Sequence, residues 1–272
     1  MKEADRCVKC GLCLPHCPTY RTWESEADSP RGRISLIQAL ASGELQDSPG
    51  LELHLDRCLS CLACEDACPS GVHYGNLIDG GRTLLNQQHP RRQSWRRLFD
   101  LLGDRRRLDR WRAIHRLLRR LRLSGLAGLI PTARWRRLAR LGDHLSEDSR
   151  PLTGLYPAAR PTGRQVQLFV GCISSQTERE LQRQSIALLS RLGFAVEIPK
   201  DQTCCGAMHR HNGFPEEAEA HCARNRQLLM RSRSEGLITL ASACHLELSL
   251  HLDSPLPVTS LIDFLLGLPL ES

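Results

Sequence analysis

Eight cysteines near the start of the chain form two copies of one motif. The first copy runs from Cys7 to Pro18 and the second from Cys58 to Pro69, and both read C-x2-C-x2-C-x3-C-P. Three thiolates in one short loop can each bind a different iron of a cubic 4Fe–4S cluster. Zinc fits this pattern poorly, because zinc sites usually take four ligands from separated C-x2-C pairs. The spacing therefore predicts two 4Fe–4S clusters.

The fourth cysteine of each motif is displaced from the loop by one extra residue and a proline. In two-cluster ferredoxins this cysteine ligates the other cluster. The first cluster is therefore assigned to Cys7, Cys10, Cys13 and Cys68, and the second to Cys58, Cys61, Cys64 and Cys17. Such crossed ligation would tie the two motifs together and hold the clusters close enough for electron transfer.

A second group of cysteines lies in the last third of the chain. It consists of Cys172, the adjacent pair Cys204 and Cys205 followed by Gly206, and Cys244. Each lies at or near the end of a predicted strand, and ligands collect at the strand ends of parallel sheets. We therefore expect four thiols to converge on a third site, for which an iron–sulfur cluster, a zinc ion and a redox-active dithiol all remain open. The alternative is that they are loop cysteines without a shared role.

Four other residues near these thiols are candidates for weaker roles. Cys222 lies within a predicted helix and is expected to be a core residue. His209, His211 and His245 lie close to the cysteines in sequence, and each is expected to be solvated or to support the site rather than to bind a metal.

The elements that must position these residues divide the chain into three zones. Residues 1–90 are expected to form an α-helical ferredoxin domain, because Ile34, Ile37, Leu40 and Ala41 share one face of a helix predicted over residues 33–45. A second helix is predicted over residues 74–88. Residues 91–160 form an arginine-rich helical segment that ends in a linker with many prolines and glycines, residues 151–163.

Residues 161–272 have the pattern of a small α/β domain. Strands are predicted over residues 165–171, 195–198 and 237–241, and they alternate with helices over residues 177–192 and 215–234. This alternation favours a small parallel sheet. The chain as a whole is therefore predicted to be α+β.

The arginine-rich segment dominates the charge of the protein. Residues 91–140 contain 17 arginines and three acids, so they carry +14, whereas the whole chain carries +7 and the other residues sum to −7. Apolar residues recur at helical spacing within it: Trp95, Leu98, Phe99 and Leu102; then Trp111, Ile114, Leu117, Leu118 and Leu121; then Trp135, Leu138 and Ala139. Such a helix can lie in the interface of an anionic membrane, with Arg96, Arg97, Arg105, Arg106 and Arg107 near the lipid headgroups. It could equally pack its apolar stripe on the ferredoxin domain.

Composition excludes several other classes of protein. Thirteen cysteines without a signal peptide indicate a metal-binding cytoplasmic chain, peripheral on the inner face of the plasma membrane if the arginine-rich segment binds lipid. No apolar run is long enough to span a bilayer. The basic segment carries no nucleic-acid recognition motif, so we expect no nucleic-acid partner. No G-x-G-x-x-G dinucleotide fingerprint opens a helix after a strand.

Together these motifs resemble the iron–sulfur subunit of glycolate oxidase. The wider group includes lactate-utilisation proteins, the iron–sulfur subunit of anaerobic glycerol-3-phosphate dehydrogenase and heterodisulfide reductase. Besides the two cluster motifs, the resemblance rests on five segments that spread it over nearly the whole chain: residues 29–34, 68–72, 169–172, 204–209 and 241–244. The segment around Cys204, Cys205 and Gly206 is the family's CCG module.

The resemblance implies an electron-transfer subunit rather than the site of substrate oxidation. Its partner would be an FAD-containing 2-hydroxyacid dehydrogenase subunit, with glycolate as the first candidate substrate, and its electrons would pass to a respiratory acceptor. The alternative is a thiol or disulfide redox enzyme of the heterodisulfide reductase kind. Two departures bear on this choice: only one CCG module is present, and the closing C-x-x-C appears as Cys244-His-Leu-Glu247 with a single thiol.

Overall fold

The computed structural model describes residues 2–88, 93–120 and 152–269. The chain forms two compact units, Met1–Arg96 with Met208–Glu217, and Arg97–Ala207 with Ala218–Ser272. The first unit holds both C-x2-C-x2-C-x3-C-P motifs, and the second holds the four later cysteines. Leu121 and the predicted stripe residues Trp135, Leu138 and Ala139 lie outside the described residues.

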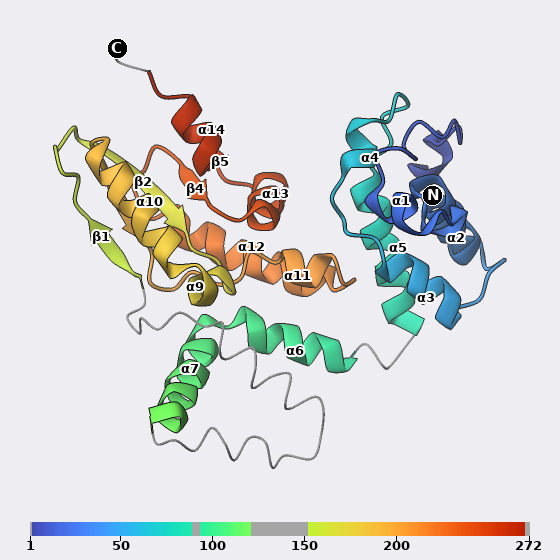
Figure 1. Cartoon of the computed structure of the whole chain (residues 1–272), viewed down its shortest axis with the longest axis horizontal. Coiled ribbons are helices and arrows are strands. Elements are labelled where there is room, and N and C mark those ends of the chain that lie inside the picture. The colour runs from blue at the N-terminus through green and yellow to red at the C-terminus, as the bar shows by residue number, and fades with distance from the viewer. Residues whose placement is uncertain (1, 89–92, 121–151, 270–272) are drawn as a thin grey trace. The chain divides into compact units, whose positions relative to one another are not determined.

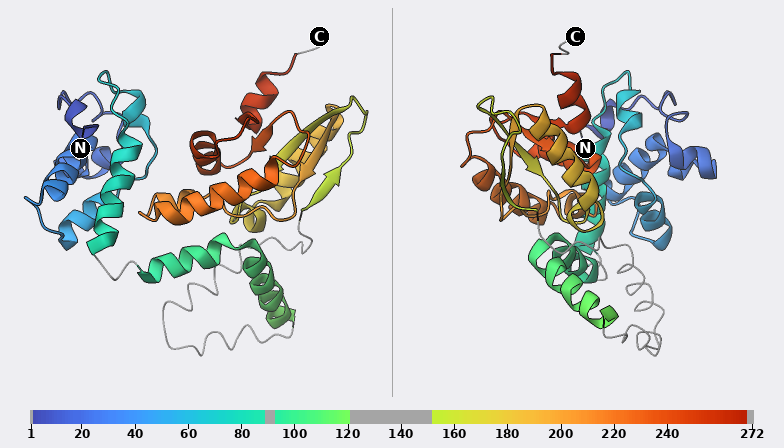
Figure 2. Two further views of the ribbon diagram at one scale, coloured as in Figure 1. Left: turned by 180° about the vertical axis from the view of Figure 1, so that it is seen from behind. Right: turned by 60° about the vertical axis from the view of Figure 1, so that its left-hand side comes forward.

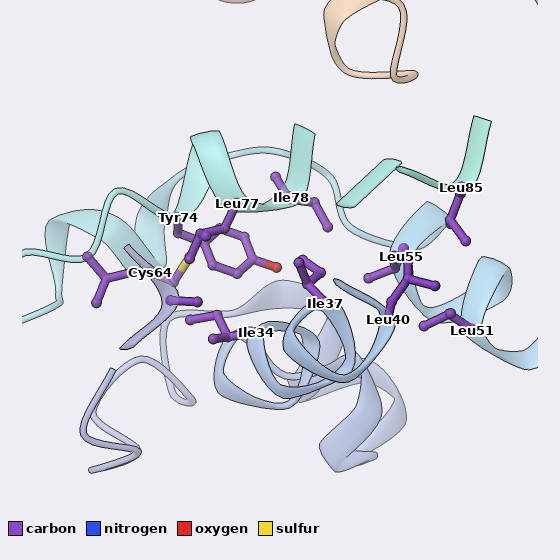
Figure 3. Close-up of a cluster of buried hydrophobic side chains, with 12 residues drawn as sticks. Ile34, Ile37, Leu40, Leu51, Leu55, Cys64, Tyr74, Leu77, Ile78 and Leu85 are labelled. Atoms are coloured by element: carbon purple, nitrogen blue, oxygen red, sulfur yellow. The ribbon is translucent and has the colours of Figure 1, made fainter. Parts of the chain in front are cut away.

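The first unit is a set of short helices around one apolar core (Figure 1, Figure 3). Its helices are η1 (Ala4–Arg6), α1 (Pro18–Trp23), η2 (Glu26–Asp28), α2 (Pro30–Ser42), α3 (Pro49–Asp56), α4 (Ala63–Asp66) and α5 (Tyr74–Gln88). The core is formed by α2, α3 and α5 through Ile34, Ile37, Leu40, Leu51, Leu55, Ile78 and Leu85. Both helices predicted between and after the motifs are present, although Ala41 is exposed rather than in the core.

The ends of α2 follow from its sequence. The Ser29 hydroxyl accepts a hydrogen bond from the Gly32 N–H at 2.9 Å, which caps the helix, and Pro30 occupies the first helical position. Gly43 ends the helix with a φ of +80°, a conformation that glycine adopts without strain. These caps fix where the apolar face of α2 meets α5.

The second unit contains a five-stranded sheet in the order β1-β3-β2-β4-β5. Its strands are β1 (Gly154–Tyr156), β2 (Arg164–Phe169), β3 (Phe194–Ile198), β4 (Leu237–Thr239) and β5 (Val258–Ser260). The three predicted strands are present and parallel, because β2 pairs in parallel with both β3 and β4. The expected linker, however, contains β1, which pairs antiparallel with β3, so the sheet is mixed rather than fully parallel.

Helices cover both faces of this sheet (Figure 1, Figure 2). On one face α10 (Arg179–Arg191) and α14 (Leu261–Leu266) pack against Val166, Leu168 and Val196. On the other, α12 (Pro215–Leu229) and α13 (Ser242–His251) pack around Phe169 and Leu237. Successive residues of β2 point to opposite faces, which places apolar side chains in both cores.

The remaining helices of the described chain are α6 (Gln93–Gly103), α7 (Arg105–Arg120), α9 (Ser174–Thr177) and α11 (Ala207–Arg210). Over residues 93–120 the arginine-rich segment therefore consists of the two helices α6 and α7. Within the described residues, no helix combines the length and the hydropathy that crossing a bilayer requires.

Candidate metal centres

The two motif loops have the same unusual backbone. Lys9 and Gly11, on either side of Cys10, have φ values of +55° and +85°, and Ser60 and Leu62, on either side of Cys61, have +51° and +59°. Three of these four residues are not glycine, so each carries a local conformational cost that persists only where the surroundings enforce it. The repeated geometry curls each loop around its middle cysteine, which is the shape needed to present three thiolates to one cluster.

The second loop closes a small cavity with the fourth cysteine of the first motif. Cys17, Cys58, Cys61 and Cys64 all line this cavity, and Thr19, Arg33 and Tyr74 are among its other walls. Burial raises the pKa of the Cys64 thiol well above its usual range, and the charges of Cys58, Cys13, Cys17 and Cys61 raise it further. Four thiols around one enclosed space fit a group that binds thiolates, because metal binding would replace their protons and remove the repulsion.

The first motif is tied to the end of the second by hydrogen bonds. The Arg6 guanidinium donates to the Ser70 carbonyl at 3.1 Å, and the Glu3 carboxylate accepts from the His73 N–H at 2.7 Å. Cys68 packs against the same core as Cys7 and Cys13. The pKa of Cys13 is raised, first by burial and then by the charges of Cys7 and Cys10. The chain segment that carries Cys68 therefore lies beside the loop to which the crossed assignment joins it.

A buried ion network supports Cys17 from behind. The Cys17 Sγ lies 3.2 Å from the Thr19 hydroxyl, which accepts a hydrogen bond from Arg33 at 2.9 Å. Arg33 and Asp28 are fully buried and form an ion pair at 3.2 Å. Arg57 and His54 also contact the Asp28 carboxylate, at 3.0 and 3.1 Å. Although burial raises the pKa of Asp28, the hydrogen bonds that its carboxylate accepts from His54 and Arg57, together with the charges of His54 and Arg33, lower it below the usual value.

Sequence reasoning did not assign a role to Arg33 or Asp28. One signal was available: Arg33 precedes Ile34 and lies three residues before Leu36, inside the buried part of a helix where a charged residue is costly unless it is paired.

Residues 208–217 belong to the first unit although they follow Cys205 in the chain. Arg82 of α5 donates to the His211 carbonyl at 2.8 Å, to the Cys58 carbonyl at 2.7 Å and to the Ser60 hydroxyl at 2.9 Å. The His211 ring lies 3.2 Å from Asp79. His211 is thus paired with a carboxylate of the first unit, whereas the four later cysteines belong to the second.

In the second unit, the four later cysteines come together at the carboxyl ends of the parallel strands. Cys172 follows β2, Cys204 and Cys205 follow β3, and Cys244 follows β4. The Cys172 and Cys204 sulfurs are 3.4 Å apart. Hydrogen bonds of Cys205 with Cys204 and Cys244 raise the pKa of Cys205, and that of Cys172 is raised by its bond with Cys204 and by burial. The structure therefore brings together the four thiols that the strand pattern predicted.

Two glycines permit this convergence. Gly206 has a φ of +107°, and a Cβ there would lie 2.9 Å from the Ala218 carbonyl oxygen, so a larger residue would collide with α12. A Cβ on Gly171, at a φ of +68°, would lie 3.6 Å from the Cys244 sulfur. Both glycines keep backbone close to the thiols.

The neighbouring candidates have supporting positions. Cys222 is buried in α12 and its thiol donates to the Cys205 carbonyl at 3.3 Å, as expected of a core residue. His209 is fully buried, so it is not solvated. Among the described residues, no three cysteine, histidine or carboxylate side chains are arranged as ligands of a single metal ion.

Two family matches agree with this geometry. The family described as a 4Fe–4S dicluster domain matches residues 3–72, and the family described as a cysteine-rich domain, CCG, matches residues 166–249. The chain is therefore an iron–sulfur protein that joins a ferredoxin-type dicluster domain to a CCG domain.

Comparison with curated proteins confirms the resemblance to glycolate oxidase iron–sulfur subunits. The chain is 31% identical over 263 residues to the probable glycolate oxidase iron–sulfur subunit of Bacillus subtilis, covering 89% of this chain and 57% of that protein. It is 31% identical over 260 residues to the glycolate oxidase iron–sulfur subunit of Escherichia coli, covering 89% and 58%. The chain thus spans a little over half the length of these relatives.

A more distant relative is a fumarate reductase (CoM/CoB) polypeptide of Methanothermobacter marburgensis. It is 22% identical over 248 residues, which cover 89% of this chain and 42% of that protein. No solved structure matches the chain.

Proposed function

We propose that this chain is the electron-transfer subunit of a flavin-linked 2-hydroxyacid dehydrogenase complex, with glycolate as the first candidate substrate. The observation that carries the proposal is the gathering of four motif cysteines from two distant segments, Cys17 and the loop from Cys58 to Cys64, around one cavity. The names of the two more similar relatives support the choice of glycolate oxidation. Oxidation of the substrate is assigned to an FAD-containing partner, which would deliver electrons for a respiratory acceptor.

In this proposal the motif cysteines hold two 4Fe–4S clusters in the crossed arrangement. Such clusters, when bound, accept and release electrons one at a time. The chain's own residues set their surroundings. Burial of Cys17 and Cys64 keeps water away from one side of the second site, and Thr19 and Arg33 fix the orientation of Cys17.

We also propose that Cys172, Cys204, Cys205 and Cys244 hold a third redox group, with an iron–sulfur cluster favoured over zinc. A single zinc ion would need all its ligands about 2.3 Å from one point, whereas a cluster binds each thiolate through a different iron. The buried thiols of Cys172, Cys204 and Cys205 and the half-buried thiol of Cys244 could supply sulfur ligands to a cluster or to zinc.

The functional test separates electron transfer from substrate oxidation. The purified chain alone should not oxidise glycolate or D-lactate with a dye acceptor. Adding an FAD-containing 2-hydroxyacid dehydrogenase subunit together with substrate should reduce the clusters, seen as bleaching of their visible absorbance. Oxidation of a 2-hydroxy acid by this chain alone, without flavin, would overturn the proposal.

The second candidate is a thiol or disulfide redox enzyme that acts at the four-thiol site. The contact between the Cys172 and Cys204 sulfurs at 3.4 Å is the observation in its favour. This candidate predicts that the isolated chain reduces a disulfide substrate when given a chemical electron donor, and that Cys204→Ser abolishes the reaction. The single thiol of the Cys244 segment favours electron transfer instead.

A further inference from the structure

Two of the three buried side chains described on α7 are arginines. Arg105, Leu108 and Arg112 lie one turn apart on this face, and all three are buried. Ile114 and Leu117, which belong to the predicted apolar stripe, are 58% and 55% exposed. A helix rich in leucine therefore directs arginine inward, which is costly unless an anion receives the charge.

The acid on this face, Asp109, is already shared by other donors. It lies 3.2 Å from Arg179 Nη2, 3.1 Å from Gln176 Nε2 and 3.9 Å from Arg112 Nη2. Gln176 belongs to α9 and Arg179 begins α10, so this carboxylate joins α7 to the segment that follows Cys172. Asp109 is thus occupied by partners other than Arg105.

Arg105 is a buried cation with hydrogen-bonding capacity left over. Its side chain is 8% exposed, and its Nε and Nη1 groups have no hydrogen-bond partner among the described residues. Burying such donors without acceptors costs free energy. Burial lowers the pKa of Arg105, while the charges of Asp109 and of the Cys172 thiolate act in the opposite direction.

The segment after Cys172 connects this arginine to the four-thiol site. The Ser175 hydroxyl of α9 donates to the Cys172 carbonyl at 2.6 Å, and the Arg179 Nε donates to the Ser175 carbonyl at 2.6 Å. Arg105 lies four residues before Asp109 on the same helix, so it belongs to the face of α7 that packs on the segment that follows Cys172. Metal-bound thiolates are anionic acceptors, so they can satisfy donors that the protein leaves unpaired.

We propose that Arg105 is a positioning residue of the four-thiol site, whose guanidinium donates N–H bonds to the thiolate side of the bound group and stabilises its reduced state. The inference rests on the proposed third redox group. One-electron reduction adds one negative charge there, breaks no bond and leaves the Arg105 proton in place. A fixed cation and N–H···S bonds favour that added charge, because hydrogen bonds to sulfur and local charge set cluster potentials.

The test is a redox titration of the full chain reconstituted anaerobically with iron and sulfide, followed by electron paramagnetic resonance. Signals that disappear in Cys244→Ser define the group at the four-thiol site. Arg105→Gln should lower the ratio of its reduced to its oxidised form about tenfold at a given potential, which is a downward shift of about 59 mV for one electron. Arg105→Lys keeps the charge but loses the planar fork, so it should shift the potential less.

Arg106→Gln is the matched control, because it removes the same charge from a side chain that is 73% exposed. It should leave the potential unchanged, and signals of the two motif clusters should be unchanged in all three arginine variants. An Arg105→Gln protein with the wild-type potential would overturn the inference while leaving the third group in place. Identical spectra for wild type and Cys244→Ser would instead remove the third group itself, and the role of Arg105 with it.

Discussion

Cys17 is the residue on which the crossed assignment depends most directly. It lies in the first motif, yet it lines a cavity with three cysteines of the second. Its sulfur contacts Thr19, which is held by Arg33. Cys17 is therefore part of the first motif by sequence and a neighbour of the second motif in the folded chain.

Replacing Cys17 by Ser should damage the cluster whose other ligands are Cys58, Cys61 and Cys64. The iron bound in the two motif sites should fall from roughly eight to roughly four per chain, because each cubane holds four irons. Iron analysis and electron paramagnetic resonance of anaerobically purified protein would measure this. Cys222→Ser is the control, since Cys222 is buried but outside both motifs. Loss of the cluster held by Cys7, Cys10 and Cys13 would contradict the crossed assignment.

The contribution of the single residue Asp28 to stability should depend on pH. Its pKa is lower in the folded protein than the usual value of 3.8, so its stabilising charge is fully present above that value and is lost only as the pH falls through the lower, folded pKa. Asp28→Asn should reduce the free energy of unfolding by about 3 kcal/mol at neutral pH, because Arg33 is left buried without its carboxylate.

Urea unfolding between pH 5 and pH 8 would test this prediction. The stability difference between wild type and Asp28→Asn should be constant across that range. The comparison should be made in a His54→Gln background, with Asp28 in one protein and the change Asp28→Asn in the other. The imidazole next to Asp28 then does not titrate over the same range. A difference that grows as the pH falls from 7 to 5 would show instead that the folded pKa of Asp28 is raised, because the folded protein would then bind the extra proton.

At the scale of elements, α7 has two faces with different partners. Its inner face meets α9 through Asp109 and Gln176. Its outer face exposes Ile114 and Leu117 together with several arginines. The expectation that Arg105 contacts lipid is corrected by its burial, since a buried guanidinium cannot reach a headgroup.

We expect the exposed face of α6 and α7 to bind anionic membrane surfaces. The chain should float with anionic liposomes at low salt and detach as salt screens the arginines. The combined change Arg97→Gln, Arg106→Gln and Arg107→Gln should weaken binding about 100-fold, since each basic residue near the surface contributes about 1 kcal/mol.

Three exposed arginines elsewhere in the second unit supply the control for this flotation assay. Changing Arg191, Arg231 and Arg233 to Gln removes the same total charge from other parts of the second unit. That protein should bind vesicles as wild type does. Equal flotation of the wild-type chain with neutral and anionic vesicles would rule out the electrostatic mechanism.

At the scale of the whole molecule, two groups of cysteines of different construction lie on one chain, one in each unit. The full chain should bind roughly eight irons in its motif sites and about four more if the four-thiol site takes a third cubane. Cys244→Ser should lose only the additional iron, because Cys244 belongs to the second unit. Iron and sulfide analysis would measure both. A Cys244→Ser protein with the iron content of wild type would argue against a third cluster.

Features that depend on local spacing could be predicted from the residues alone. The two cysteine motifs, the helix predicted over residues 33–45, which overlaps α2, and the three parallel strands are each encoded within a short segment. The convergence of Cys172, Cys204, Cys205 and Cys244 could also be predicted, since strand ends at one edge of a parallel sheet must lie together.

Features that depend on contacts between distant segments became visible only in the folded chain. β1 pairs with β3 inside a stretch whose prolines and glycines indicate a linker, because pairing depends on a partner strand rather than on composition. The pairing of Arg33 with Asp28 and the burial of Arg105 were not predictable from helical periodicity, which defines the faces of a helix but not the groups that those faces contact. A buried guanidinium is stable only beside an anion, and the ion pair of Arg33 with Asp28 becomes visible only in the folded chain.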